Sequence, residues 1–354
     1  MANIDSVSVL ICTYNRAELL AQTLEALSRA TAPEACAVEI VVVDNNSTDD
    51  TAAVVRRAAA LGPWPVQYVH ERQQGKSFAL NAGLSVSQGD IIALTDDDVL
   101  PSADWLVRTV ANFRTADGVV FVFGKVLPRW AVSPPPEMLT VRARDIWGPL
   151  ALVDYGEDTI RYAAATFGTR RLPVGANLSI RRDAIERIGG WRTDLGKVDN
   201  TLIAGEDHEL CVRLFLAGLY SGIYDPTVSV RHLVPASRLT RRYFRRWFYW
   251  HGRTMARMAD AVYLDLDLTR VPSIAGVPRF VYREFLQQGL RWLGRIGRSD
   301  GLALLIEEVK LVEYVGFFSE TWRSRLTSRR SLGQGAVAAT QDTRATHATH
   351  ECSR

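Results

Sequence analysis

Residues 38–51, VEIVVVDNNSTDDT, show the pattern that decides the fold: a β-branched run ends in polar residues and leads directly into a helical pattern. Similar pairs of strand and helix repeat along the first third of the chain. We expect strands at SVSVLICTY, VEIVVVDN, VQYVHE, DIIALTDDD and VVFVFGKV, and helices near 17–29, 49–60, 77–87 and 104–113. Because parallel strands need crossover connections, this alternation predicts a largely parallel sheet covered by helices on both faces.

The composition is that of an ordinary globular protein. The 354 residues are 47% apolar and 23% charged, with a net charge of only +3, which gives no general argument for nucleic-acid binding. The four cysteines, at 12, 36, 211 and 352, form no CxxC pair, so neither a zinc site nor a disulfide framework is indicated. The first residues lack a basic n-region, and charges interrupt every long apolar stretch. We therefore expect a cytoplasmic protein without a transmembrane span.

The run Thr95-Asp96-Asp97-Asp98, at the end of an apolar strand, is the strongest local feature. Three adjacent carboxylates repel one another, so a cation or a basic partner is expected to neutralise them. Mg²⁺ commonly binds one or two carboxylates together with substrate phosphates. Since alternate residues of an extended segment face the same side, Asp96 and Asp98 are the pair expected to share a metal. The competing interpretation is a solvated acidic turn that caps the next helix.

Other polar residues follow neighbouring strands and should meet the acidic triplet at the carboxyl edge of the sheet, where such folds bind ligands. Asp44 ends the second predicted strand, and Arg72 and Lys76 follow the third, where they can offset phosphate charge. The first strand leads into Thr13, Tyr14, Asn15 and Arg16. Each residue has an ordinary structural explanation alone, but their convergence favours a nucleotide site.

Six segments together resemble the family 2 glycosyltransferases, which have the GT-A fold. In chain order they are VSVLICTYNR, VVVDNNSTDDT, ERQQGKSFALNAGL, ALTDDDVLP, GANLSIRR and AGEDHELCVRL. The resemblance spans roughly residues 6–235, and its specificity comes from the order and spacing of the segments. It implies a Rossmann-like α/β fold with a mixed, largely parallel sheet flanked by helices, and a helical C-terminal extension.

The chain divides into four parts, because the alternation of strand and helix breaks at about residue 128 and the pattern from Leu239 to about Arg330 is mainly helical. The resemblance names the first two parts. Residues 1–127 would form the nucleotide-sugar-binding half of the GT-A domain, and 128–237 the acceptor-binding and catalytic half. Residues 238–330 would form a helical C-terminal region. Residues 331–354, rich in Ala, Thr, Gln and Ser, are predicted to be a disordered tail.

The same resemblance assigns roles at the donor site. Thr13, Tyr14 and Asp44 would hold the nucleobase, while Lys76 and Arg72 would lie near the base or the diphosphate. Asp96 and Asp98 would form the DxD motif for Mg²⁺ or Mn²⁺, although the extra carboxylate of Asp97 leaves the choice of ligands open. The full implied donor set is Thr13, Tyr14, Asn15, Arg16, Asp44, Arg72, Lys76, Asp96, Asp97 and Asn177.

A second acidic cluster, Glu206-Asp207, opens a helix after Gly205. Carboxylates in a first turn are favoured by the helix dipole whatever their function. An inverting transfer also needs a base that removes the proton of the acceptor hydroxyl. By the resemblance, Asp207 would be that base, and Glu206 would orient the acceptor or neighbouring groups.

Three further residues take roles from the resemblance. His232 is a candidate contact to the metal or diphosphate, and is about as easily explained as a structural histidine. Asn177, in the segment Gly175-Ala176-Asn177, would line the sugar pocket, where small neighbours allow close approach to the backbone. Trp191 would contact the acceptor, although core packing is the commoner role of tryptophan.

Residues 238–257 combine seven arginines with six aromatic residues and no acid. As an amphipathic helix, this stretch could lie on the inner face of an anionic membrane or meet a phosphorylated lipid acceptor. The alternative is an aromatic face packed on the catalytic domain, with the arginines either solvated or near the diphosphate. Tyr243 to Trp247 partly resembles the QxxRW signature of processive members, but Tyr243 replaces its glutamine. Single-sugar addition is therefore expected.

The sequence thus predicts an inverting glycosyltransferase, of the hexosyltransferase type, that uses a nucleotide-diphosphate sugar and a hydroxyl acceptor. Asp44 and Tyr14 favour a UDP- or dTDP-linked donor, the acceptor is a polysaccharide, glycolipid or glycosylated metabolite, and cell-envelope polysaccharide synthesis is the expected context. A dehydrogenase would need a GxGxxG turn where the chain reads CTYNRAE, and a P-loop would need a glycine at His70. A non-catalytic nucleotide-sugar or carbohydrate-binding module on the same fold is the remaining alternative.

Overall fold

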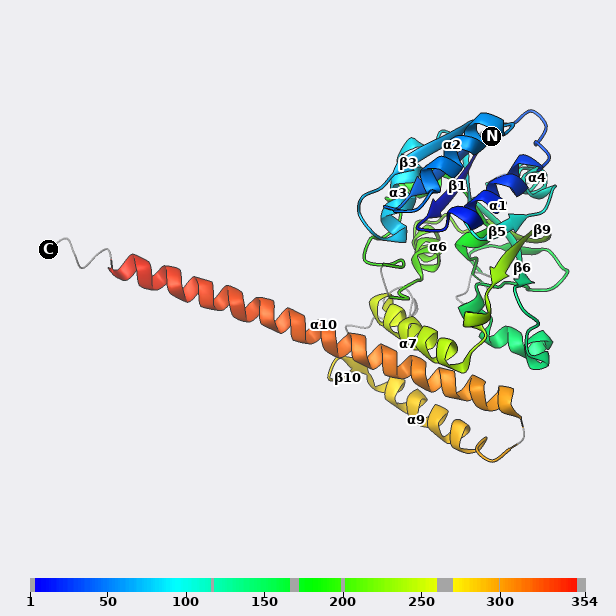
Figure 1. Ribbon diagram of the computed structural model, residues 1–354. Coiled ribbons are helices and arrows are strands. Elements are labelled where there is room, and N and C mark those ends of the chain that lie inside the picture. Colours follow the sequence, from blue (N-terminus) through cyan, green and yellow to red (C-terminus); the bar gives the residue numbers. More distant parts are fainter. Residues whose placement is uncertain are drawn as a thin grey trace.

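The computed structural model of the protein describes residues 4–115, 118–165, 172–198, 201–259, 270–298 and 300–348, with side chains of the last helix described as far as Arg325. A nine-stranded mixed sheet forms its centre, in the order β3-β2-β1-β4-β8-β6-β9-β5, with β7 also paired to β9 (Figure 1). Its strands are β1 Ser6–Thr13, β2 Ala37–Asp44, β3 Val66–His70, β4 Ile91–Asp96, β5 Val99–Pro101, β6 Phe121–Trp130, β7 Ile160–Tyr162, β8 Leu178–Arg181 and β9 Gly222–Val234.

Helices connect and flank these strands. They are α1 Ala17–Ser28, α2 Thr51–Leu61, α3 Lys76–Val86, α4 Trp105–Thr115, α5 Arg182–Arg187, α6 Glu206–Leu216, α7 Arg241–Arg257, α9 Arg279–Leu293 and α10 Gly301–Ala348. Short 3₁₀ turns at η1 Pro136–Leu139, η2 Val141–Ile146 and η3 Gly148–Leu150 occupy the irregular segment after β6, and η4 Gly175–Asn177 precedes β8. The four helices predicted near 17–29, 49–60, 77–87 and 104–113 are confirmed as α1 to α4, and each of their ends lies within two residues of the prediction.

The first four long strands are parallel, as the alternation of strand and helix predicts. β1 lies between β2 and β4, and β3 joins β2, whereas β8 runs antiparallel to both β4 and β6. Thr13 pairs with Asp44, and Cys12 pairs with Asp96. The polar residues that end β1, β2 and β4 therefore lie along one edge of the sheet, where ligands bind in folds of this type.

The core explains why the strands carry so few polar residues. Val41, Val42, Val43, Ile91 and Ile92 are fully buried because helices cover both faces of the sheet. The same cluster extends to Phe244 and Phe248 of α7 and to Val309 of α10. The first part of the helical C-terminal region is thus packed against the catalytic domain.

Two expectations about organisation differ from the structure. The pattern break expected at residue 128 falls inside β6, which continues through Pro128 and pairs in parallel with β9 as far as Trp130. The segment predicted to be disordered, 331–354, is helical up to Ala348, because α10 continues without interruption from Gly301 and projects from the body in Figure 1. Alanine and glutamine are good helix formers, which offsets the shortage of large apolar side chains there. Residues 349–354 lie outside the described residues.

Candidate active site

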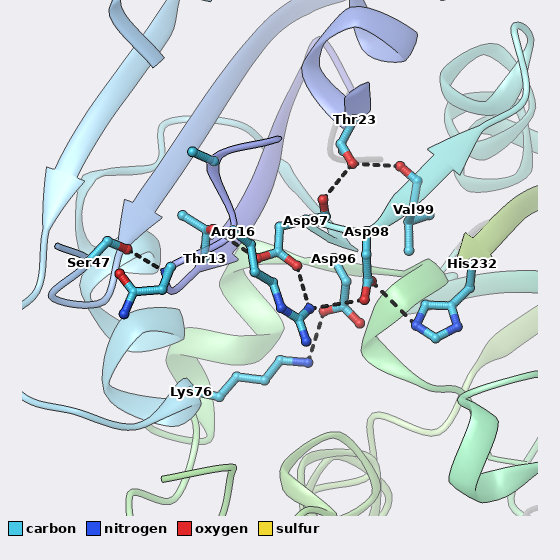
Figure 2. A network of polar contacts seen from close by, with 12 residues as sticks. Thr13, Arg16, Thr23, Ser47, Lys76, Asp96, Asp97, Asp98, Val99 and His232 are labelled. Atoms are coloured by element: carbon cyan, nitrogen blue, oxygen red, sulfur yellow. Dashed lines mark hydrogen bonds and ion pairs between the residues drawn. The ribbon is translucent and has the colours of Figure 1, made fainter. Parts of the chain in front are cut away.

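The acidic triplet lies at the floor of a cavity of about 250 Å³ at the carboxyl edge of the sheet. The cavity is lined by Cys12, Thr13, Tyr14, Arg16, Asn45, Gln74, Lys76, Ala79, Asp96, Asp97, Asp98, Ala151, Lys197, His232 and Arg238. The backbone of the triplet is fixed from α1, where Thr23 Oγ1 lies 2.9 Å from the carbonyl oxygens of both Asp97 and Val99 (Figure 2).

Each carboxylate of the triplet has at least one cationic partner, and Arg16 is shared by two of them. Asp96 Oδ1 lies 3.1 Å from Lys76 Nζ. Asp97 accepts hydrogen bonds from Thr13 Oγ1 at 2.8 Å and from Arg16 at 2.9 Å. Arg16 also reaches Asp98 at 3.0 Å, so that one guanidinium joins two carboxylates (Figure 2). The three negative charges that the sequence places side by side are therefore separated by cations.

His232 reaches the triplet through strand pairing. β5 runs antiparallel to β9, with Val99 opposite His232, so the imidazole lies next to Asp98. His232 Nε2 is 3.3 Å from Asp98 Oδ1, and Arg238 lies 3.4 Å from the same nitrogen. The imidazole is buried, and its Nδ1 has no hydrogen-bond partner among the described residues.

The three carboxyls of the triplet differ in pKa, because each has different neighbours. Burial raises the pKa of Asp97 to about 6, despite its contact with Arg16. Burial acts in the same direction on Asp98, but the hydrogen bond and charge of His232, with Arg16, outweigh it and hold the pKa of that carboxyl well below its usual range. Lys76 likewise outweighs burial and lowers the pKa of Asp96. The outer two carboxylates are thus the ones held ionised.

Lys76 links the triplet to the second acidic cluster. Its Nζ lies 3.1 Å from Asp96 Oδ1 and 3.6 Å from Glu206 Oε1. Gly75, with φ of +140°, allows the chain to turn into α3 directly before this lysine. Asn45 fixes the turn by accepting from the Gly75 amide at 2.8 Å. The two acidic segments, distant in sequence, therefore share one neighbourhood.

Asp207 is held by one oxygen only. Its Oδ2 accepts from the Gly175 amide at 2.8 Å, while Oδ1 is buried without a hydrogen-bond partner among the described residues. Burial and the neighbouring charge of Glu206 raise the pKa of Asp207 to about 7, although Lys76 acts in the opposite direction. A carboxyl of this kind is suited to proton transfer near neutral pH.

The nucleobase residues predicted at β1 and β2 lie at the expected edge but are already engaged. Asp44 is buried and accepts from the Ser47 amide at 2.8 Å and from Tyr68 Oη at 2.7 Å. Asn15, at φ of +51°, accepts from the Thr48 amide at 2.7 Å. Tyr14 is 47% exposed at the cavity, so its ring is available for stacking.

Seven predicted site residues do not line the cavity: Asn15, Asp44, Glu206 and Asp207, described above, and also Asn177, Trp191 and Arg72. Asn177 is buried, donates to the carbonyl oxygens of Lys125 and Val228, and accepts from Trp105 Nε1, so its amide serves the core rather than a sugar. Trp191 is also buried in the core, as a tryptophan commonly is. Arg72 is exposed in the turn after β3 and does not line the cavity.

Two cationic residues that line the cavity, Lys197 and Arg238, were not predicted as site residues from the sequence. Lys197 comes from an irregular segment that no periodicity identifies, although its carbonyl oxygen accepts from the Lys76 amide at 3.1 Å. Arg238 was noted as the first arginine of a basic stretch whose arginines were expected in solvent, near the diphosphate or at a membrane, and it was not assigned to the site individually. Both line the cavity together with Arg16 and Lys76, so that it holds four cationic side chains.

A divalent cation fits this donor set only when the substrate supplies further ligands. Among the described residues, no group of three or more His, Cys, Asp and Glu side chains is arranged to hold a metal ion. Asp98 and His232 converge within 3.3 Å, with Asp96 nearby. Mg²⁺ sites of this kind are completed by phosphate oxygens and water. Cavity, cations and paired acidic clusters at this sheet edge are those of a nucleotide-diphospho-sugar transferase.

Comparison with known proteins agrees with this class. A family model described as Glycosyl transferase family 2 matches residues 8–189, just over half of the chain, and the chain therefore belongs to this family. It is 30% identical over 262 residues to the succinoglycan biosynthesis protein ExoM of Rhizobium meliloti (strain 1021), which covers 72% of this chain and 77% of that protein. The protein is thus a glycosyltransferase that uses a nucleotide sugar, and the alternative of a non-catalytic module is set aside.

Two further similarities bear on fold and context. A glucosyl-dolichyl phosphate glucuronosyltransferase of Haloferax volcanii is 25% identical over 259 residues, covering 73% of this chain and 78% of that protein. The solved structure of mannosyltransferase PcManGT from Pyrobaculum calidifontis, in complex with GDP-Man and Mn²⁺, superposes with a TM-score of 0.59 at 22% identity, covering 90% of this chain and 88% of that chain. The latter confirms the GT-A fold.

The basic aromatic stretch forms α7 but offers no apolar face to a membrane. Its aromatic side chains are all buried or half-buried. Acidic residues of α10 cover its other side, where Arg245 pairs with Glu308 at 2.7 Å and Arg253 pairs with Glu320 at 2.5 Å. The aromatic side chains are thus packed within the protein, as the second interpretation expects, and a membrane contact through 238–257 stays a prediction. No described helix is long and apolar enough to span a membrane.

Proposed function

We propose that the protein is an inverting, metal-dependent glycosyltransferase that adds a single sugar to a hydroxyl acceptor. The observation that carries this proposal is the bridge from Asp96 through Lys76 to Glu206. We infer from this bridge that a cluster suited to binding a charged diphosphate works together with Asp207, a carboxyl with a raised pKa and one oxygen without a partner among the described residues. Donor binding and proton removal thereby become neighbouring tasks of one site.

Asp207 acts as the general base in this proposal. Its ionised carboxylate takes the proton of the acceptor hydroxyl while that oxygen bonds to the anomeric carbon, and the bond from this carbon to the diphosphate breaks. The attack comes from the side opposite the leaving group, so the anomeric configuration inverts. The Gly175 amide orients Asp207, and Glu206 keeps Lys76 near both clusters.

The cations of the cavity stabilise the leaving nucleoside diphosphate. Arg16, Lys76, Lys197 and Arg238 line the cavity together with the triplet. Preorganised positive charge is most effective where negative charge develops in the transition state. Asp98, His232 and Asp96 would hold Mg²⁺ or Mn²⁺, which supplies Lewis-acid stabilisation of the diphosphate when bound. The Mn²⁺ in the PcManGT complex is consistent with this assignment.

The chemistry of individual residues also bears on the donor and the acceptor. Tyr14, 47% exposed at the cavity, offers a ring for stacking on a uracil or thymine base. Asp44 already accepts from the Ser47 amide and from Tyr68 Oη, so it would exchange one of these contacts for the imide N–H of such a base. The name of the Haloferax volcanii relative includes a dolichyl phosphate, and this supports a lipid-linked acceptor for the present chain. The glutamine of processive enzymes is replaced by Tyr243, which supports single addition.

A screen of nucleotide sugars tests the proposal directly. Thermal stabilisation and release of free sugar should be measured for UDP-, dTDP- and GDP-linked donors, with and without Mn²⁺. A productive donor should raise the melting temperature only when metal is present. The anomeric configuration of a transfer product, read by NMR, should be opposite to that of the donor. Retention of configuration, or metal-independent turnover at the full rate, would overturn the mechanism.

A further inference from the structure

α9 carries an apolar stripe on the side that faces away from the rest of the protein. Leu286, Leu290 and Leu293 are 65%, 71% and 56% exposed. Their spacing of four and three residues places them on one face of the helix. The opposite face holds the buried Val281 and Gln288, which lie against α10. Figure 1 shows α9 as an outer element, with α10 between it and α7.

Positive charge surrounds this stripe. Residues 279–298 contain five arginines, and Glu284 is their single acidic residue. Arg279 and Arg283 precede Leu286 by seven and three positions, so they lie on the same helix face as the leucines. Within the described part of the chain, neither of these two arginines has an acidic partner at ion-pair distance.

We propose that α9 is a docking surface for a bilayer that contains anionic phospholipids. The leucine stripe enters the boundary between headgroups and acyl chains, and the arginines bind the phosphate headgroups. Interfacial helices bind through these two contributions, apolar area and attraction to anionic lipid. The contact is at the bilayer surface, because α9 exposes its leucines on one face and packs its other face against α10.

A second copy of this chain is a less suitable occupant. The series Arg279, Arg283, Leu286, Leu290 and Leu293 has the seven-residue spacing of a coiled-coil seam. Pairing two such helices would bring arginines of both copies to one interface without acids to offset them. Positive charge on both copies opposes their association, whereas an anionic bilayer compensates it.

Vesicle flotation of the full chain tests the surface. The wild type is compared with Leu286→Gln/Leu290→Gln and with Leu61→Gln/Leu216→Gln, whose leucines are 79% and 65% exposed on other helices. With vesicles of phosphatidylcholine containing roughly one-third phosphatidylglycerol, the α9 variant should lose roughly 10- to 100-fold in partitioning. The matched control should bind like the wild type.

The arginines are tested separately with Arg279→Gln/Arg283→Gln. At low salt we expect roughly a fivefold loss of partitioning per arginine, and the loss should shrink as salt screens the charges. Vesicles of phosphatidylcholine alone should not distinguish this variant from the wild type. This second variant keeps the test valid if the leucine substitutions alter folding.

Three results would overturn the proposal. The first is a wild-type protein that does not float with anionic vesicles, and the second is equal loss in the α9 variant and its control. The third is a wild-type dimer in sedimentation that dissociates in Leu286→Gln/Leu290→Gln without any vesicle binding. Donor-induced thermal stabilisation, measured in every variant, separates failure of this surface from failure of the proposed catalytic site.

Discussion

The two acidic clusters of the site differ in how their charges are balanced. In the triplet, Asp96 and Asp98 are paired with cations, and the pKa of each is lowered. In the second cluster, Asp207 has one oxygen without a partner and a pKa raised to about 7. The same residue type therefore serves two tasks: ionised carboxylates hold a charged ligand, and a poised carboxyl exchanges a proton.

Removing the base should give the largest effect. Asp207→Asn preserves shape but cannot accept a proton, so the rate of transfer should fall roughly 10²- to 10⁴-fold. Donor affinity, measured by calorimetry, should be unchanged because the triplet is intact. Asp183→Asn, on the exposed side of α5, is the control and should transfer normally. Near-normal turnover of Asp207→Asn would show that Asp207 is not the base.

Substitution in the triplet should instead weaken donor binding. Asp98→Ala removes the carboxylate shared by Arg16 and His232, and metal-dependent donor binding should weaken by roughly 10- to 100-fold. The measurement is donor affinity over a Mn²⁺ titration. Asp104→Ala, in the turn after β5, should leave the titration unchanged. Full metal-dependent affinity in Asp98→Ala would assign the metal to other groups.

Gly175→Ala tests whether the position of Asp207 matters. A Cβ at residue 175 would lie 2.6 Å from Asp207 Oδ2, so the carboxylate must move. A displacement of this size should lower kcat by roughly 10- to 100-fold while donor affinity is kept. Gly289→Ala, which meets nothing within 4 Å, is the matched control. An unchanged kcat in Gly175→Ala would show that orientation by this segment is unimportant.

The smallest effect concerns pH. Because Asp207 must be ionised to act, kcat/KM should fall as pH drops below about 7, the pKa of this carboxyl in the free enzyme. The positive charge of Lys76 lowers that pKa, so Lys76→Met should move the acid limb to higher pH. The check is the position of the limb rather than the absolute rate. If the acid limb of the kcat/KM profile stays in place or moves to lower pH in Lys76→Met, Lys76 does not connect the two acidic clusters as proposed.

Much of the site could be predicted because it lies at strand ends. Asp44 and Asp96 follow periodic apolar strands, and parallel pairing brings such ends to one edge. Residues in irregular segments could not be placed in this way. Lys197 carries no periodic signal, and Asn177 was assigned to a ligand although the interior uses its amide.

The sequence alone determined the alternation of strand and helix, the parallel half of the sheet and the two acidic clusters, because these depend on local periodicity and composition. Tertiary structure decided which charges meet: Lys76 between Asp96 and Glu206, and His232 beside Asp98 through the pairing of β5 with β9. It also decided that α7 is covered while α9 is open, although both helices are rich in arginine and apolar residues. Burial and electrostatics depend on neighbours distant in the chain, and no local pattern specifies those neighbours.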